Sequence, residues 1–123
     1  MNIIIDTHIF LWALSDPGRI STSKRLALED LSNTIYVSAV SIAEIMIKVS
    51  VGKLKIDFNL VDMATESGFA LLDFSAEAAL WLKDMPFHHK DPFDRMLIAQ
   101  SITDNFPIMT DDSKIALYHC RVM

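Results

Sequence analysis

A chain of 123 residues, 51% of them hydrophobic, is the size of one domain and can bury a core without disulfide or metal support. The formal net charge of −5 argues against a protein that coats nucleic acid without regard to sequence, although it does not exclude a nuclease with local basic groups. No apolar run can span a membrane, because Glu44 and Lys48 interrupt the longest one, and the lone Cys120 has no partner for an internal disulfide, so a cytoplasmic protein is expected.

The first half of the chain is expected to alternate short strands with helices. In chain order the pattern predicts a strand at residues 2–5, a helix at 7–14, a helix at 21–31, a strand at 35–37, a helix at 41–50 and a helix at 60–67. The run Ser15-Asp16-Pro17-Gly18 is a strong breaker that ends the first helix, and Ser21 can cap the second. Gly52 and Gly68 mark the ends of the two later helices.

The second half continues this alternation. The pattern predicts a strand at 69–72, a helix at 76–83, a histidine-rich loop at 84–91, a helix at 92–103, a strand at 108–110, a short helix at 113–117 and an edge strand at 119–122. Pro92 suits the first position of its helix, with Asp91 as the natural cap. Such an alternation predicts an α/β fold, in which helices flank a central parallel sheet of four to five short strands in one domain, residues 1–123.

Four acidic residues lie at or near the start of a predicted helix. They are Asp6 after the first strand, Glu44 and Asp94 early in two helices, and Asp112 after the last central strand. The carboxyl ends of parallel strands share one edge of a sheet, so these acids are expected to converge there. Crowded carboxylates repel one another unless a cation lies between them, and Mg²⁺ prefers oxygen ligands. The sequence therefore predicts a divalent-metal site that could activate a water toward a phosphodiester.

Each of these acids also has a purely structural explanation. Asp6 and Asp112 could cap the helices that follow them, and Ser41 with Glu44 matches the capping box. Asp94 lies at the third position of its helix, where a negative charge suits the helix dipole. Four acids at one predicted edge of a sheet favour a metal site over four separate caps.

The histidines do not predict a zinc site. No cysteine pair accompanies them, and His8 and His119 lack helical ligand spacing. The run His88-His89-Lys90 could contact phosphate at the edge of the site or form a solvated loop. Arg95 could meet phosphate or pair with a nearby acid, and Trp12 is interpreted as a packing residue.

Four stretches of this chain resemble the PIN-domain ribonucleases, and more narrowly the toxin component of VapBC-type toxin–antitoxin pairs. They are NIIIDTHIFLWAL, VSAVSIAEI, HHKDPFDRMLIAQ and IMTDDSKI, which together run through nearly the whole sequence. HHKDPFDRMLIAQ is a specific motif, and the order of all four strengthens the resemblance. The resemblance assigns the family's acids to Asp6, Glu44, Asp94 and Asp112, although Asp111 could share or take the last role.

This resemblance implies an endoribonuclease that depends on Mg²⁺ or Mn²⁺ and leaves 5′-phosphate and 3′-hydroxyl ends. It also implies a homodimer, or a hetero-oligomer with a cognate antitoxin whose tail covers the acidic site. The implied protein inhibits growth by cutting RNA. Structured RNA such as tRNA is a reasonable target class, because its loops present unstacked bases.

Two other functions stay open from the residues alone. The chain could be a catalytically silent α/β binding module whose acids act as caps and solubilising charge. A phosphatase of the haloacid dehalogenase type would also be α/β and Mg²⁺-dependent, but it needs a second Asp two residues after the first, where this chain has His8. Calorimetric metal binding, repeated with Asp6→Asn, separates the nuclease from the binding module.

Overall fold

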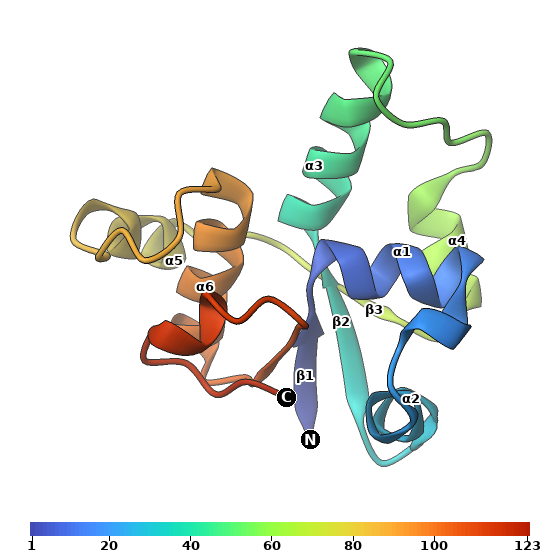
Figure 1. Cartoon of the computed structure of the whole chain (residues 1–123), viewed down its shortest axis with the longest axis horizontal. Coiled ribbons are helices and arrows are strands. Elements are labelled where there is room, and N and C mark those ends of the chain that lie inside the picture. The colour runs from blue at the N-terminus through green and yellow to red at the C-terminus, as the bar shows by residue number, and fades with distance from the viewer.

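A single parallel sheet of four strands organises the computed structural model, which describes all residues from Met1 to Met123 (Figure 1). The strands are β1 (Asn2–Ile5), β2 (Thr34–Ser38), β3 (Ala70–Leu72) and β4 (Ile108–Met109), in the spatial order β3-β2-β1-β4. β1 lies in the interior of the sheet, where Ile5 pairs with Val37 on one side and Met109 on the other. The predicted α/β fold with a parallel sheet is confirmed, with four strands.

Six α-helices connect and cover the strands. They are α1 (Thr7–Ser15), α2 (Thr22–Glu29), α3 (Ala39–Ser50), α4 (Leu60–Glu66), α5 (Ala76–Leu80) and α6 (Pro92–Asp104). The predicted caps are present: the Ser21 hydroxyl accepts the Lys24 N–H, and the Asp91 carboxylate accepts the N–H groups of Phe93 and Asp94. No helix combines the length and the apolar character that a bilayer span requires.

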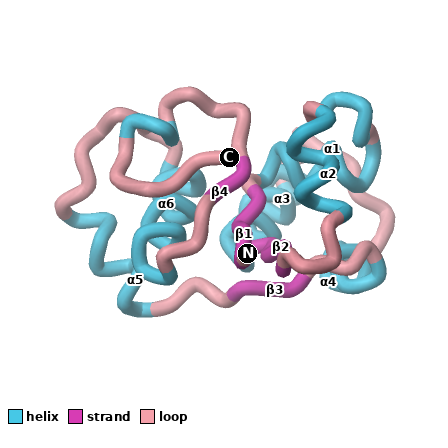
Figure 2. Tube along the Cα trace, turned by 90° about the horizontal axis from the view of Figure 1, so that it is seen from below, coloured by secondary structure: helices cyan, strands magenta, loops and turns pink.

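The sheet separates two apolar clusters, because successive side chains of a strand point to opposite faces. Ile3 and Ile5 pack into one cluster with residues of α1, α3 and α4, while Ile4 packs into the other with residues of α5 and α6. Figure 2 shows the same division, with α5 and α6 on one side of the strands and the first four helices on the other. This three-layer packing presents the carboxyl end of β1, and with it Asp6, between the two groups of helices.

Four elements differ from the sequence prediction. α3 begins at Ala39 rather than at residue 41, because the Ser38 hydroxyl at the end of β2 accepts the Val40 N–H at 3.0 Å and caps the helix. The predicted helix at 76–83 divides into α5 and a 3-10 turn, Trp81–Lys83, and the predicted short helix near the C-terminus is the 3-10 turn Ile115–Leu117. The predicted edge strand at 119–122 is wrong, since only Val122 bridges to the sheet, opposite Ile108.

Candidate functional site

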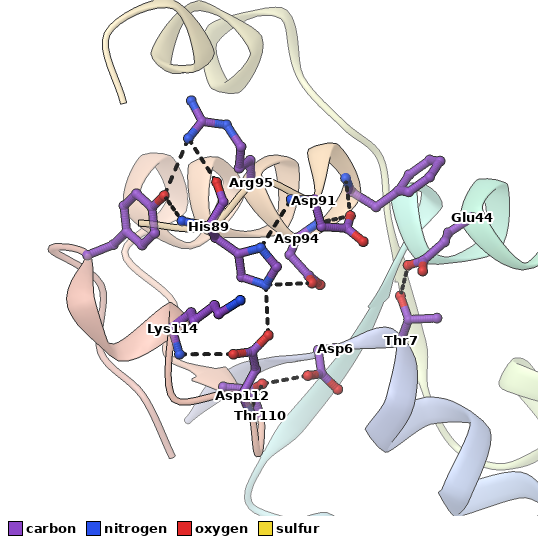
Figure 3. A network of polar contacts seen from close by, with 12 residues as sticks. Asp6, Thr7, Glu44, His89, Asp91, Asp94, Arg95, Thr110, Asp112 and Lys114 are labelled. Atoms are coloured by element: carbon purple, nitrogen blue, oxygen red, sulfur yellow. Dashed lines mark hydrogen bonds and ion pairs between the residues drawn. The ribbon is translucent and has the colours of Figure 1, made fainter. Parts of the chain in front are cut away.

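Acidic side chains from four segments meet at the carboxyl edge of the sheet (Figure 3). Asp6 directly follows β1, Glu44 lies in the helix that begins where β2 ends, and Asp112 follows β4. Asp94 reaches the same edge from the first turn of α6. The structure thus brings together all four acids that the sequence singled out, and their role as metal ligands stays a prediction.

The Asp6 carboxylate is held by α1, which follows it, and by Thr110, the residue after β4. One carboxylate oxygen, Oδ1, accepts the Ile9 N–H at 2.8 Å, so the expected cap of α1 is present. The other oxygen, Oδ2, accepts the Thr110 hydroxyl at 2.5 Å. That hydroxyl in turn accepts the Asp112 N–H at 3.0 Å, so Thr110 links two of the acids.

Glu44 is buried and is held from two directions. The Thr7 hydroxyl donates to its Oε1 at 2.7 Å, and the Lys48 ammonium donates to its Oε2 at 2.7 Å. The hydrogen bond to Glu44 raises the pKa of Lys48, so this amine stays protonated. Because Ser38 caps α3, the capping-box explanation of Ser41 and Glu44 is wrong. The burial of the Glu44 carboxylate near other acids is therefore not explained by a capping role.

His89 is the site residue that the sequence analysis missed. The sequence predicts a solvated or phosphate-contacting loop at this position, but His89 is only 7% exposed. Its Nδ1 accepts the Asp91 N–H at 3.1 Å, which leaves the proton of a neutral imidazole on Nε2. Nε2 donates to Asp112 Oδ2 at 2.7 Å, and it also lies 3.0 Å from Asp94 Oδ2. The one sequence signal for this role was its place in the stretch HHKDPFDRMLIAQ.

The guanidinium of Arg95 fixes the loop that carries His89. Arg95 is buried and donates at 2.8 to 3.4 Å to the backbone carbonyls of Leu82, Met85, Pro86 and His89 and to the Tyr118 hydroxyl. A planar guanidinium with five donors can satisfy this many acceptors at once. Tyr118 also accepts the His89 N–H at 2.9 Å. Both expected roles of Arg95, contact with phosphate and pairing with an acid, are therefore wrong.

The two consecutive aspartates after β4 have different partners. Asp112 accepts from His89, whereas the exposed Asp111 forms an ion pair with Lys24 of α2. The Lys24 ammonium also donates to the Thr110 carbonyl at 2.9 Å, so it anchors the turn that carries both aspartates. This geometry favours Asp112 over Asp111 as the fourth acid of the site.

The pKa values of the site acids report how strongly these charges are crowded. Burial raises the pKa of Asp94 to about 6, and the charges of Asp91, Glu44 and Asp6 add to the rise while His89 opposes it. Burial also raises the pKa of Asp6, against the hydrogen bonds from Thr110 and Ile9. Burial would raise the pKa of Asp112 too, but its hydrogen bonds with the Lys114 N–H and with His89 hold it below the ordinary value. The ionised forms of Asp6 and Asp94 are therefore energetically disfavoured in the folded protein without a cation.

The donor set suits a hard divalent cation. His89, Asp94 and Asp112 each bring one potential ligand atom within 4.8 Å of the others. Because His89 Nε2 is a hydrogen-bond donor here, the ligands available to a cation are carboxylate oxygens, as Mg²⁺ and Mn²⁺ prefer. Among the four acids, Asp94 Oδ1 is the one carboxylate oxygen that has neither a hydrogen bond nor an ion-pair contact within the chain. A cation at this oxygen would relieve the repulsion that raises the pKa of Asp94.

Comparisons with known proteins agree with this arrangement of elements. The family model for the PIN domain matches residues 3–119. VapBC2 from Rickettsia felis, solved with a promoter DNA fragment, has 20% identity and a TM-score of 0.77 over 100% of this chain and 98% of that chain. DNA-bound VapBC from Salmonella typhimurium has 13% identity and a TM-score of 0.70 over 100% and 97%. VapC20 from Mycobacterium tuberculosis, a toxin that cleaves the sarcin–ricin loop, has 18% identity and a TM-score of 0.61 over 96% and 95%. A sequence search among curated proteins finds no match.

Proposed function

The chain belongs to the PIN-domain family, and on that premise we propose that it is a metal-dependent endoribonuclease, the growth-inhibiting toxin of a toxin–antitoxin pair. Residues 1–123 form the nuclease domain in this proposal. The observation that carries it is the convergence of acids from four segments at one sheet edge, with the pKa values of Asp6 and Asp94 raised by burial. Such crowding is typical of a site that works with a bound cation.

Asp6, Glu44, Asp94 and Asp112 are the residues proposed to hold Mg²⁺ or Mn²⁺. A bound divalent ion supplies Lewis acidity for a phosphodiester and an acidified water. The chain's own contribution is to orient the oxygens: Thr110 holds Asp6, Thr7 and Lys48 hold Glu44, and His89 holds Asp94 and Asp112. These hydrogen bonds and ion-pair contacts leave Asp94 Oδ1 free within the chain, which makes Asp94 the first candidate ligand.

The test of the proposal is RNA cleavage by the purified protein without any partner. We expect cleavage of single-stranded and tRNA-like substrates with Mg²⁺ or Mn²⁺, 5′-phosphate and 3′-hydroxyl products, and loss of cleavage when a chelator removes the ion. Gel analysis of end-labelled RNA measures both the rate and the ends. A protein that cuts no RNA with either ion contradicts the proposal, and if it also binds no ion by calorimetry, the silent binding module is favoured.

The proposed partners are an RNA substrate and a cognate antitoxin in the cytoplasm. The similar structures from Rickettsia felis and Salmonella typhimurium are complexes of a VapBC type, which supports an antitoxin for this chain. An antitoxin tail with Arg or Lys would satisfy the same buried carboxylates that attract a cation. The assembly is proposed to be a homodimer or a hetero-oligomer of toxin and antitoxin.

His89 is expected to act as a positioning residue for the carboxylates. His89→Leu removes the donor that joins Asp94 and Asp112, and should weaken Mn²⁺ binding about 10- to 100-fold, as loss of such an outer hydrogen bond typically does. His89→Gln keeps an N–H donor on a side chain of similar reach and should recover most of the affinity. Isothermal calorimetry with Mn²⁺ compares the three proteins. Equal affinity for wild type and His89→Leu would show that this imidazole does not organise the acids.

A further inference from the structure

A second feature adjoins the carboxylates: a hollow of about 340 Å³ beside the first turns of α1. It is lined by Asp6, Asp111 and Asp112 and by His8, Trp12 and Arg19. This volume is at the small end of ligand sites, about 300–1,000 Å³, and suits part of a polymer rather than a large molecule. Two of its residues, Asp6 and Asp112, belong to the site described above, so an occupant of the hollow would lie next to the four acids.

The guanidinium of Arg19 has a defined position but no polar partner. It lies 4.8 Å from the centre of the Trp12 ring, in a cation–π contact. It forms no ion pair or hydrogen bond with another residue, whereas the guanidinium groups of Arg95 and Arg121 both donate to backbone carbonyls. Trp12 packs against the apolar cluster that contains Ile3 and Ile5, as expected from the sequence, so the ring that Arg19 contacts is held in place. Arg19 therefore presents its donors to solvent and the hollow.

His8 is a second neighbour of Trp12 that lines the hollow. Its ring lies 5.9 Å from the Trp12 ring at 45°, and it makes no hydrogen bond within the chain. Its imidazole can supply a further N–H to the same hollow. An unpartnered guanidinium and an unpartnered imidazole thus lie beside a cluster of acids.

We propose that Arg19, supported by Trp12 and assisted by His8, binds the backbone phosphate next to the scissile phosphodiester of a single-stranded RNA. This inference rests on the proposed function. Buried acids repel a polyanion, and a chain of net charge −5 offers little general attraction, so a substrate needs local cations near the cut. Arg has a planar fork of donors that matches phosphate. Arg19 forms no ion pair with the aspartates that line the same hollow.

RNA is favoured over an acidic segment of a partner protein because the hollow shares Asp6 and Asp112 with the proposed catalytic site. A substrate must pass its phosphates beside these acids in order to be cut there. A protein carboxylate at Arg19 would gain no comparable advantage from that neighbourhood. The two occupants are distinguished by experiment.

The test measures RNA binding against salt concentration in the cleavage-deficient Asp94→Asn background, with a labelled single-stranded RNA of ten nucleotides. Each phosphate contact contributes about 0.7 to the slope of log affinity against log salt for a single strand. Arg19→Gln should lower this slope by about 0.7, and Arg19→Lys, which keeps the charge, should largely preserve it. Arg121→Gln is the matched control, since Arg121 contacts the Asn105 carbonyl before β4, and it should leave the slope unchanged.

Measurements of RNA cleavage and Mn²⁺ binding show whether only the Arg19 subsite is wrong or the proposed function is wrong as well. In the protein that keeps its native Asp94, Arg19→Gln should raise KM about tenfold or more, which is the usual effect of losing one charge-assisted hydrogen bond. The value of kcat and the affinity for Mn²⁺ should not change. If the wild type cleaves RNA but Arg19→Gln changes neither KM nor the salt slope, the subsite is wrong and the function stands. Absence of both RNA binding and cleavage overturns both. A hexaglutamate peptide that binds more tightly than RNA, and only with Arg19 present, would assign the hollow to a protein partner instead.

Discussion

Asp94→Asn is expected to lower the rate of RNA cleavage by at least about 100-fold while the protein stays folded. Loss of an outer hydrogen bond at a metal site typically costs 10- to 100-fold, and Asp94 is proposed to be a ligand itself. The asparagine keeps the shape of the side chain and can still accept the His89 N–H, so packing is preserved. Initial rates with a labelled RNA, in Mn²⁺ and in Mg²⁺, measure the effect, and circular dichroism checks the fold.

Asp6→Asn and Asp111→Asn complete this experiment. Asn is as good a helix cap as Asp, so Asp6→Asn should keep the hydrogen bond from Ile9 and the fold, and lose cleavage as strongly as Asp94→Asn. Asp111→Asn should lose at most a few-fold, because Asp111 pairs with Lys24 outside the cluster. Cleavage retained by both Asp6→Asn and Asp94→Asn would place the metal ligands elsewhere. A large loss in Asp111→Asn would move the fourth role from Asp112 to Asp111.

The metal-free protein is expected to lose stability as the pH rises from about 4 to above 6. Because the pKa of Asp94 is about 6 in the folded state against 3.8 as the reference, the folded chain binds a proton in this window that the unfolded chain has released. Stability then falls with pH, by about 3 kcal/mol at 1.36 kcal/mol per pH unit. The raised pKa of Asp6 acts in the same direction, whereas the lowered pKa of Asp112 acts only below pH about 4. Urea unfolding in the presence of a chelator, at a series of pH values, measures the trend.

Asp94→Asn should remove most of this pH dependence and stabilise the metal-free protein at pH 7.5 by about 2–3 kcal/mol, because it removes one crowded charge. Asp57→Asn, at an exposed loop position, is the control and should change little. Mn²⁺ should restore stability to the wild type at pH 7.5 but much less to Asp94→Asn. A wild-type unfolding free energy that stays level or rises between pH 5 and 7.5 without metal would show that these acids are not crowded.

Much of the secondary structure was predictable because its signals are local. The apolar run at β1, the breaker after α1 and the cap pair Asp91-Pro92 each lie within a few residues of the element that they define. The error at the start of α3 arose because two local signals compete there. Ser38 and Ser41 are both plausible caps, and Ser38 caps α3 because it lies at the end of β2, where its hydroxyl also donates to Gln100 at 2.5 Å. That contact joins residues far apart in the sequence, so no local pattern could reveal it.

The sequence by itself determined the alternation of strands and helices, and thereby which acids would stand at the carboxyl edge of a parallel sheet, because hydrophobic periodicity and strand direction follow from the order of residues. Only the tertiary structure decided the partner of each charge. It directed Asp112 to His89 and Asp111 to Lys24, buried Arg95 among backbone carbonyls, and left Arg19 free beside Trp12. A hydrogen bond requires its atoms within about 3 Å, so the packing of remote segments selects which donor reaches which oxygen.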